Sequence, residues 1–279
     1  MAQKQNNGKT VFLIVWIALI VILLAAIFII GIPKEHSETI KEAMKDGVMH
    51  ETNKISLFGL IDVNPALISA YVVTAALLIG AVLIRIFALP RFKDVPGFFQ
   101  SVIEKLVEFF SGMAKDHSPH KTAFVASYIF SAGVYIFFST LFELFGIQAL
   151  TTAGHSIALP APLADINAAI AMGFMSYLVI LFAGIIVNGA RGGLSVLKDF
   201  SLPVSMSFRL FGALISGMLV TELVYYYAGL SFGLPVIVGV LFTLLHAVIQ
   251  TYVLATLVST FYGEAVEPRK KKEKKKRKA

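Results

Sequence analysis

Long apolar runs dominate this chain, and its polar residues gather between them. Six runs reach the roughly 20 residues that a helix needs to cross about 30 Å of hydrocarbon. None of them alternates with period two, so a membrane β-barrel is a poor fit. The runs are Val11–Ile32, Pro65–Leu89, Ala123–Leu144, Ile166–Val187, Leu202–Tyr227 and Pro235–Tyr262. The pattern predicts an all-α fold, a polytopic membrane helix bundle of about six transmembrane helices.

The first run has two interpretations. Lys4 and Lys9 precede it, as basic residues precede the apolar core of a secretory signal peptide. The run is longer than the 7–15 residues typical of such a core, and no A-x-A cleavage motif follows before Pro33. A retained membrane anchor is therefore the favoured interpretation.

A segment between the second and third runs, Val95–Met113, is amphipathic. Its apolar residues form one stripe along a helix, and the opposite face carries Gln100, Glu104, Lys105 and Glu108. This pattern is typical of a helix that lies in the membrane interface, here on the cytoplasmic side. It fits a helix packed against a soluble partner equally well, and the sequence leaves both interpretations open.

Charge adds an orientation to this picture. The net charge of +7 lies wholly in the segment 267–279, which has nine basic and two acidic residues. Other lysines and arginines gather near the N-terminus and after the second and fourth runs, as is typical of cytoplasmic loops. Both termini are therefore expected in the cytoplasm. The basic tail either contacts anionic lipid headgroups or is a solvated segment without a partner.

Composition also excludes several classes of protein. Charged residues make up 15% of the chain, against about 25% in soluble domains, and the mean hydropathy is +0.79. Lysines and arginines are not spread over a folded face, as nucleic-acid binding requires. The absence of cysteine excludes disulfides and thiolate metal sites. No H-E-x-x-H, G-x-S-x-G or Walker motif is present, so an intramembrane enzyme is a poor fit.

Arg209 is the residue that an apolar span tolerates least. It stands about nine residues from the cytoplasmic end of its run, or roughly 13 Å along a helix. A charge at such depth costs at least about 2.5–3.5 kcal/mol on insertion scales, and a guanidinium stays charged. No carboxylate of this chain clearly shares its depth, so we expect one from another subunit. The alternative is a helix–helix pair with Gln250, which lies mid-way along the last run.

Two more ionisable residues, Glu222 and His246, fall in the outer half of the predicted bundle. His246 and Gln250 share one helix face because they are four residues apart. Carboxylate and imidazole groups both exchange protons near neutral pH when their surroundings shift their pKa. Together these residues predict a polar path from the outside toward Arg209. The alternative for His246 is a hydrogen-bonded histidine in the bundle interior.

Four motifs resemble subunit a of the F-type ATP synthases and follow that family's order. The stretch LPVSMSFRLFGALISG resembles the family's arginine signature, and HAVIQTYVLATLVSTFYGEA resembles its closing motif. VPGFFQSVIEKLVEFF resembles its cytoplasmic helix, and PLADINAAIAM resembles the opening of its fourth span. The matches extend from about Pro65 to Ala265, which is most of the chain.

The resemblance implies a stator subunit of the Fo sector in a bacterial plasma membrane. Its partners would be the c-subunit ring, the b-subunit stator, the other ATP synthase subunits and membrane lipid. Arg209 would be the essential arginine and Gln250 its partner, beside two half-channels for protons or sodium ions. ATP chemistry would belong to other subunits, and no cofactor or metal is implied. Residues 65–266 would form the ion-translocating core, between an N-terminal anchor and external segment (1–64) and the tail (267–279).

The chain departs from the family pattern near the outer half-channel. Ala213 stands where asparagine is usual, and Met218 stands where a glutamate is often found, one turn before Glu222. Thr243 occupies another position that some members give to a histidine or acid, with His246 nearby. We therefore expect a rearranged outer half-channel. A stand-alone secondary transporter or channel is the alternative function, but it predicts an internal symmetry that the sequence lacks.

Overall fold

Helices make up most of the part of the chain that the computed structural model describes. The described residues are Phe12, 14–18, Val21, 54–57, 61–119, 121–150, Thr152, 156–226 and 234–268. Five helices among them are long and apolar enough to cross a membrane. These correspond to the second to sixth predicted runs, so the predicted polytopic helix bundle is confirmed. The first predicted run lies mostly outside the described residues, and its role as an anchor stays a prediction.

The first long helix, α3 (Pro65–Leu83), begins and ends in characteristic ways. Asn64 caps its start, where Oδ1 accepts a hydrogen bond of 3.0 Å from the backbone N–H of Ala66. Proline at the first helical position has no N–H to leave unsatisfied. The helix continues into a π-helical turn (Ile84–Ala88) and a 3-10 turn (Leu89–Arg91). The chain then bends into the next helix.

The predicted amphipathic segment forms α4 (Phe98–His117). The side-chain amide of Gln100 clamps its entry loop, accepting from the N–H of Lys93 (3.0 Å) and donating to the carbonyl of Lys93 (2.8 Å). Much of the apolar face is exposed: Phe98 is 88% exposed, whereas Phe110 is buried, with an exposed fraction of only 2%. The prediction of a helix is confirmed, and its position in the membrane interface stays a prediction.

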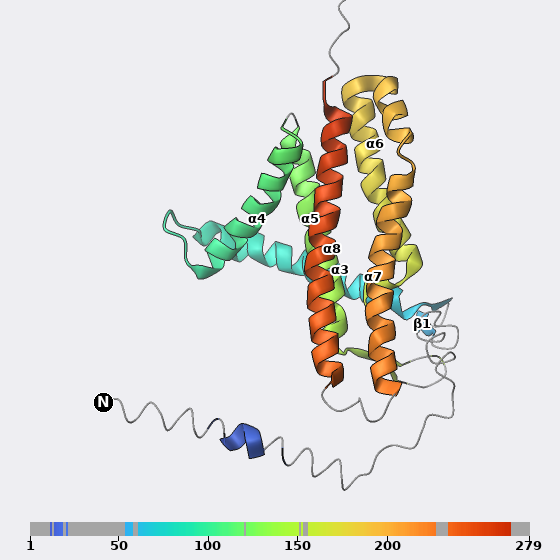
Figure 1. Ribbon diagram of the computed structural model, residues 1–279. Coiled ribbons are helices and arrows are strands. Elements are labelled where there is room, and N and C mark those ends of the chain that lie inside the picture. Colours follow the sequence, from blue (N-terminus) through green and yellow to red (C-terminus); the bar gives the residue numbers. More distant parts are fainter. Residues whose placement is uncertain are drawn as a thin grey trace, which may run out of the picture.

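The remaining helices form the body of the bundle. α5 (Thr122–Leu141) ends in a 3-10 turn that Gly146 closes with φ 57°. Then follow α6 (Ile166–Leu197), α7 (Ser201–Tyr226) and α8 (Leu234–Val266). In Figure 1, α5 to α8 run alongside one another, while α3 crosses them at a steep angle and α4 returns to the start of α5.

Two small antiparallel hairpins join the helices at the end where α3 begins. β1 (Ile55–Leu57) pairs with β2 (Ile61–Val63), and β3 (Gln148–Leu150) pairs with β4 (Ser156–Ala158). The backbone N–H of Thr152 donates to the carbonyl of Lys54 (3.0 Å) and so ties the hairpins together. These hairpins lie on the side opposite the basic loops.

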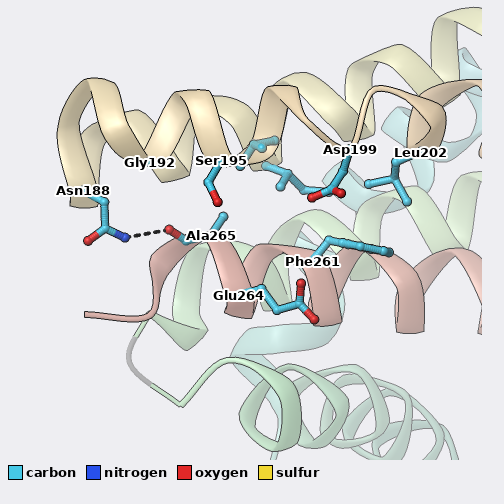
Figure 2. A pocket seen from close by; sticks show the side chains of 10 residues that line it. Asn188, Gly192, Ser195, Asp199, Leu202, Phe261, Glu264 and Ala265 are labelled. Atoms are coloured by element: carbon cyan, nitrogen blue, oxygen red, sulfur yellow. Dashed lines mark hydrogen bonds between the residues drawn. The ribbon is translucent and has the colours of Figure 1, made fainter. Parts of the chain in front are cut away.

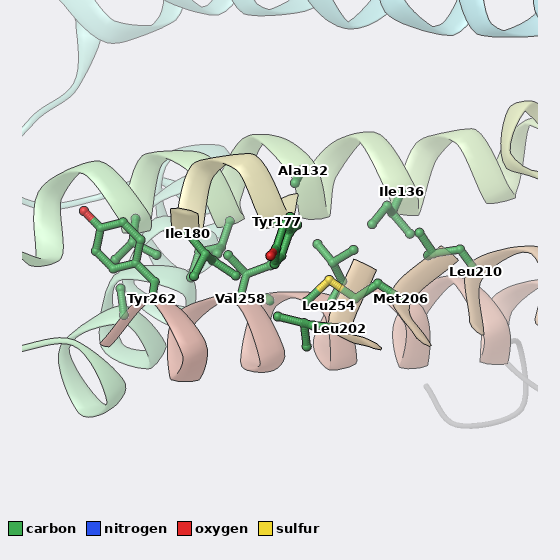
Figure 3. Close-up of a cluster of buried hydrophobic side chains, with 14 of the residues drawn as sticks. Ala132, Ile136, Tyr177, Ile180, Leu202, Met206, Leu210, Leu254, Val258 and Tyr262 are labelled. Atoms are coloured by element: carbon green, nitrogen blue, oxygen red, sulfur yellow. The ribbon is translucent and has the colours of Figure 1, made fainter. Parts of the chain in front are cut away.

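The apolar core lies where α5, α6, α7 and α8 meet (Figure 3). Fully buried side chains come from each helix, including Ile136 of α5, Ile180 of α6, Met206 of α7 and Val258 of α8. Glycines let these helices approach closely. A Cβ added to Gly173 of α6 would collide with the Ser207 hydroxyl of α7. The core fixes the register of α7 and α8, on which the predicted site residues lie.

Candidate functional site

Arg209 lies on the open side of α7. Its neighbours Ser207 and Leu210 are buried, with exposed fractions of 5% and 2%. Arg209 itself is exposed, and Phe208 is 63% exposed. Within the described part of the chain, no hydrogen bond or ion pair of Arg209 is found. The arginine is therefore directed away from the core of its own chain.

Gln250 lies on the buried side of α8. It is 6% exposed, and its side-chain Oε1 is buried without a hydrogen-bond partner among the described residues. The next residue, Thr251, donates to the carbonyl of Gly133 in α5 (3.3 Å), which fixes this face of α8 against α5. Buried acceptors are normally hydrogen-bonded, so Oε1 of Gln250 is free to accept a hydrogen bond from a side-chain donor or a water molecule.

The level of Arg209 along the bundle follows from two contacts of α6. The Nδ2 atom of Asn188 donates to the carbonyl of Ala265 (2.8 Å), and Gly173 lies against Ser207. Residue 173 is 15 positions from residue 188, and residue 250 is 15 positions from residue 265. At 1.5 Å per residue, Ser207 and Gln250 therefore both lie about 22 Å from the Asn188 end.

A third contact gives an independent count. A Cβ on Gly217 of α7 would lie 4.0 Å from Nδ1 of His246 in α8. Counted from this contact, Arg209 lies about one helical turn nearer to the Asn188 end than Gln250 does. Counted from Ser207, Arg209 lies slightly farther from the Asn188 end than Gln250 does. The two residues therefore lie at nearly the same level on adjacent helices, and no hydrogen bond joins them in this structure.

The chain reverses at Gly189, between the fourth and fifth predicted runs, and the sequence did not predict the helical segment that follows the reversal. Gly189 has φ 63° and ψ −155°. Beyond it, Gly192 packs on the carbonyl of Gly184, and the Tyr177 hydroxyl donates to the carbonyl of Val196 (3.3 Å). Residues 190–200 therefore run back along α6 before α7 begins. Measured along the helices, Arg209 lies about 25 Å from the Asn188 end of the bundle.

The other predicted path residues lie further toward the hairpin end. His246 is partly buried, and its Nδ1 is 2.7 Å from the carbonyl of Phe242. Glu222 belongs to α7, but its side chain is outside the described part of the structure. The structure brings His246 to the α7–α8 interface, while the part that Glu222 takes in the path stays a prediction.

A small polar pocket lies between the folded-back segment 190–200 and the end of α8 (Figure 2). Ser195 and Asp199 extend toward α8, and Glu264 lies on α8 itself. Asn188 closes the pocket through its bonds to the carbonyls of Ala265 and Glu267. The sequence analysis missed these residues, because only the reversal at Gly189 brings them together. The Asn-Gly pair at 188–189 was the one local signal of a turn.

A clustered metal site is not part of this arrangement: among the described residues, no group of three or more His, Asp or Glu side chains could hold a metal ion. The chain was also compared with models of protein families. The model of the family described as ATP synthase, A chain, matches residues 68–263. The match covers α3 to α8 and includes Arg209, Gln250 and the folded-back segment.

Proposed function

The chain belongs to the ATP synthase A chain family, and we propose that it acts as the stator of ion translocation, with Arg209 facing a ring of c subunits. The observation that carries this proposal is an exposed arginine in the interior of a 26-residue apolar helix. No ion pair satisfies this charge among the described residues, so an anion supplied by another subunit would fit it. A buried carboxylate on each c subunit would supply that anion.

The mechanism follows from the charge of Arg209. A ring carboxylate that arrives opposite the guanidinium is stabilised as an anion, because a nearby opposite charge favours ionisation. It therefore releases its ion on one side of the arginine. A neutral ring site can face lipid, whereas a charged site cannot. Rotation of the ring is thereby rectified, and the membrane potential contributes about 2.3 kcal/mol per charge per 100 mV.

Two half-channels would give the ring carboxylates access to the two sides. On the hairpin side, His246 at the α7–α8 interface supports a polar route, with Glu222 further along α7. On the basic side, the pocket of Ser195, Asp199 and Glu264 supports the second route. Asp199 is ten residues, or about 15 Å along a helix, from Arg209. The fixed positive charge of Arg209 lies between the routes and opposes a direct leak.

Gln250 would assist Arg209 from the neighbouring helix. Its unsatisfied Oε1 is an acceptor at the level of the arginine. A hydrogen bond between the two, direct or through water, would hold the guanidinium when no ring carboxylate is opposite it. The chain itself would perform no ATP chemistry, which belongs to the partner subunits.

Cross-linking tests the orientation of the α7 surface. The chain has no cysteine, so Phe208→Cys introduces a single thiol beside Arg209. We expect it to form a disulfide with a c subunit that carries a cysteine next to its buried carboxylate. The matched control is Phe87→Cys, another exposed phenylalanine (55%) in the π-helical turn after α3. Cross-linking of the control but not of Phe208→Cys would contradict the proposal.

The coupling ion is a proton or a sodium ion, and the ring carboxylate that selects between them belongs to another subunit. ATP hydrolysis by the purified complex distinguishes the two. Stimulation by added NaCl, relative to KCl at equal ionic strength, would identify sodium.

A further inference from the structure

The folded-back segment 190–200 carries a shallow groove of about 480 Å³ that is distinct from the pocket between Asp199 and Glu264. Its lining residues are Arg191, Leu194, Ser195, Leu197 and Lys198. Arg191 and Lys198 are seven residues apart, which is two helical turns or about 10 Å on one face. The groove therefore has a basic group at each end.

The floor of the groove is apolar and open. Leu194 is 60% exposed and Leu197 is 49% exposed. Gly192 and Gly193 on the other side of the same segment are buried against α6. The segment thus presents one face to its own bundle and a mixed basic and apolar face outward.

The two basic groups lack a partner among the described residues. Both are exposed, and neither forms an ion pair with a described carboxylate. Asp199, the next residue after Lys198, lines the pocket toward α8 (Figure 2) and does not line the groove. The groove therefore combines unpaired positive charge with exposed hydrocarbon, the combination that matches a lipid with a negative headgroup.

We propose that this groove binds one anionic phospholipid, with its phosphate between Arg191 and Lys198 and an acyl chain along Leu194 and Leu197. The location fits, because the reversal at Gly189 marks an end of the helix bundle, where headgroups lie. The charge distribution of the loops assigns this end to the cytoplasmic leaflet. Basic residues near such a surface attract anionic lipid with about 1 kcal/mol each, or roughly fivefold in affinity.

A tryptophan placed in the groove can report on the bound lipid. Trp16 is the one tryptophan of the chain, so Leu194→Trp in a Trp16→Phe background gives a single fluorophore at an exposed position. The full chain is reconstituted into phosphatidylcholine nanodiscs that contain either brominated phosphatidylglycerol or brominated phosphatidylcholine. At equal mole fraction, we expect phosphatidylglycerol to quench with several-fold higher apparent affinity.

Variants that remove basic charges distinguish lipid binding in the groove from a general electrostatic attraction between the protein and anionic lipid. Arg191→Gln together with Lys198→Gln should bring the preference for phosphatidylglycerol close to one. The control is Lys105→Gln together with Lys115→Gln, which removes the same charge from exposed positions of α4. It should leave the preference intact. Equal quenching by both lipids in the parent protein, or an equal loss in the control, would overturn the proposal.

Two further arms identify the source of the anion. Sodium phosphate, compared with sodium chloride at equal ionic strength, should not displace the brominated lipid; selective displacement would assign the groove to free phosphate. Deletion of residues 269–279 should keep the preference. Its loss on deletion would assign the lipid to the basic tail and would overturn the groove as the site.

Discussion

Asn188 of α6 is hydrogen-bonded to the end of α8, 77 residues away: its side-chain Nδ2 lies 2.8 Å from the carbonyl oxygen of Ala265. The same nitrogen donates to the carbonyl of Glu267 at 3.1 Å. The last carbonyls of a helix have no partner within the helix, so this asparagine satisfies two of them. It also fixes the position of α8 relative to α6, and therefore the level of Gln250.

Replacement of Asn188 should loosen this end of the bundle. Asn188→Ala removes both hydrogen bonds, and we expect a loss of about 1–2 kcal/mol in the free energy of unfolding. Denaturation of the purified protein in detergent, followed by circular dichroism, measures the change. Asn167→Ala is the control, because this asparagine is exposed at the start of α6. Equal stability of the two variants would show that the Asn188 bonds contribute nothing.

The packing of α4 on α5 depends on the absence of a side chain at Gly133. An added Cβ there would lie 2.7 Å from the ring of Phe110 and 3.1 Å from a methyl carbon of Thr251. Gly133→Ala should therefore destabilise the protein by about 1–3 kcal/mol through overpacking. Gly112→Ala in α4 should be neutral or stabilising, because a Cβ there meets nothing within 4 Å and alanine favours the helix. Thermal unfolding of both variants measures the difference.

Gly212 tests whether the surface beside Arg209 faces another subunit. A Cβ at Gly212 meets no atom within 4 Å in the described part of the chain, so Gly212→Leu should leave the fold intact. It should nevertheless slow ATP synthesis several-fold if a ring of c subunits moves past this surface. Gly80→Leu on α3, where a Cβ also meets nothing, is the control. Full activity of Gly212→Leu would mean that no subunit approaches α7 there.

Much of this architecture was predictable because each membrane-spanning helix requires a long apolar run in the sequence. The runs beginning at Pro65, Ala123, Ile166, Leu202 and Pro235 each correspond to a helix. The largest difference in boundary is at the fourth run, which ends at Val187, whereas α6 extends to Leu197. Arg209 was equally visible, since it is the one basic residue of its run. The match to the ATP synthase A chain family confirms the resemblance that the four motifs indicated.

Two consecutive spans imply a reversal between Val187 and Leu202, but the sequence did not predict that residues 190–200 pack back along α6, because the cause of that packing is tertiary. Arg191, Gly192 and Gly193 follow the turn, and the close packing of Gly192 on the carbonyl of Gly184 is visible only in the structure. Consequently, the pocket of Asp199 and Glu264 was missed. The relation of Arg209 to Gln250 likewise required the register that Asn188 and Gly173 set between helices.

The outer route predicts unequal roles for two glutamates. Glu222→Gln should slow ion-driven ATP synthesis more than Glu143→Gln, because Glu222 belongs to the proposed path and Glu143 lies in the 3-10 turn after α5. Initial rates of ATP synthesis in proteoliposomes, at a fixed imposed ion gradient, give the comparison. Equal effects of the two substitutions would remove Glu222 from the path.

The central claim concerns Arg209, and its most direct test is ATP synthesis driven by an imposed ion gradient and potential in proteoliposomes. The Arg209→Ala complex should assemble with its full set of subunits and yet synthesise no ATP above background. Arg85→Ala, which removes an exposed arginine from the π-helical turn after α3, should retain most of the activity. Coupled synthesis by the assembled Arg209→Ala complex at a rate near that of the parent would contradict the account.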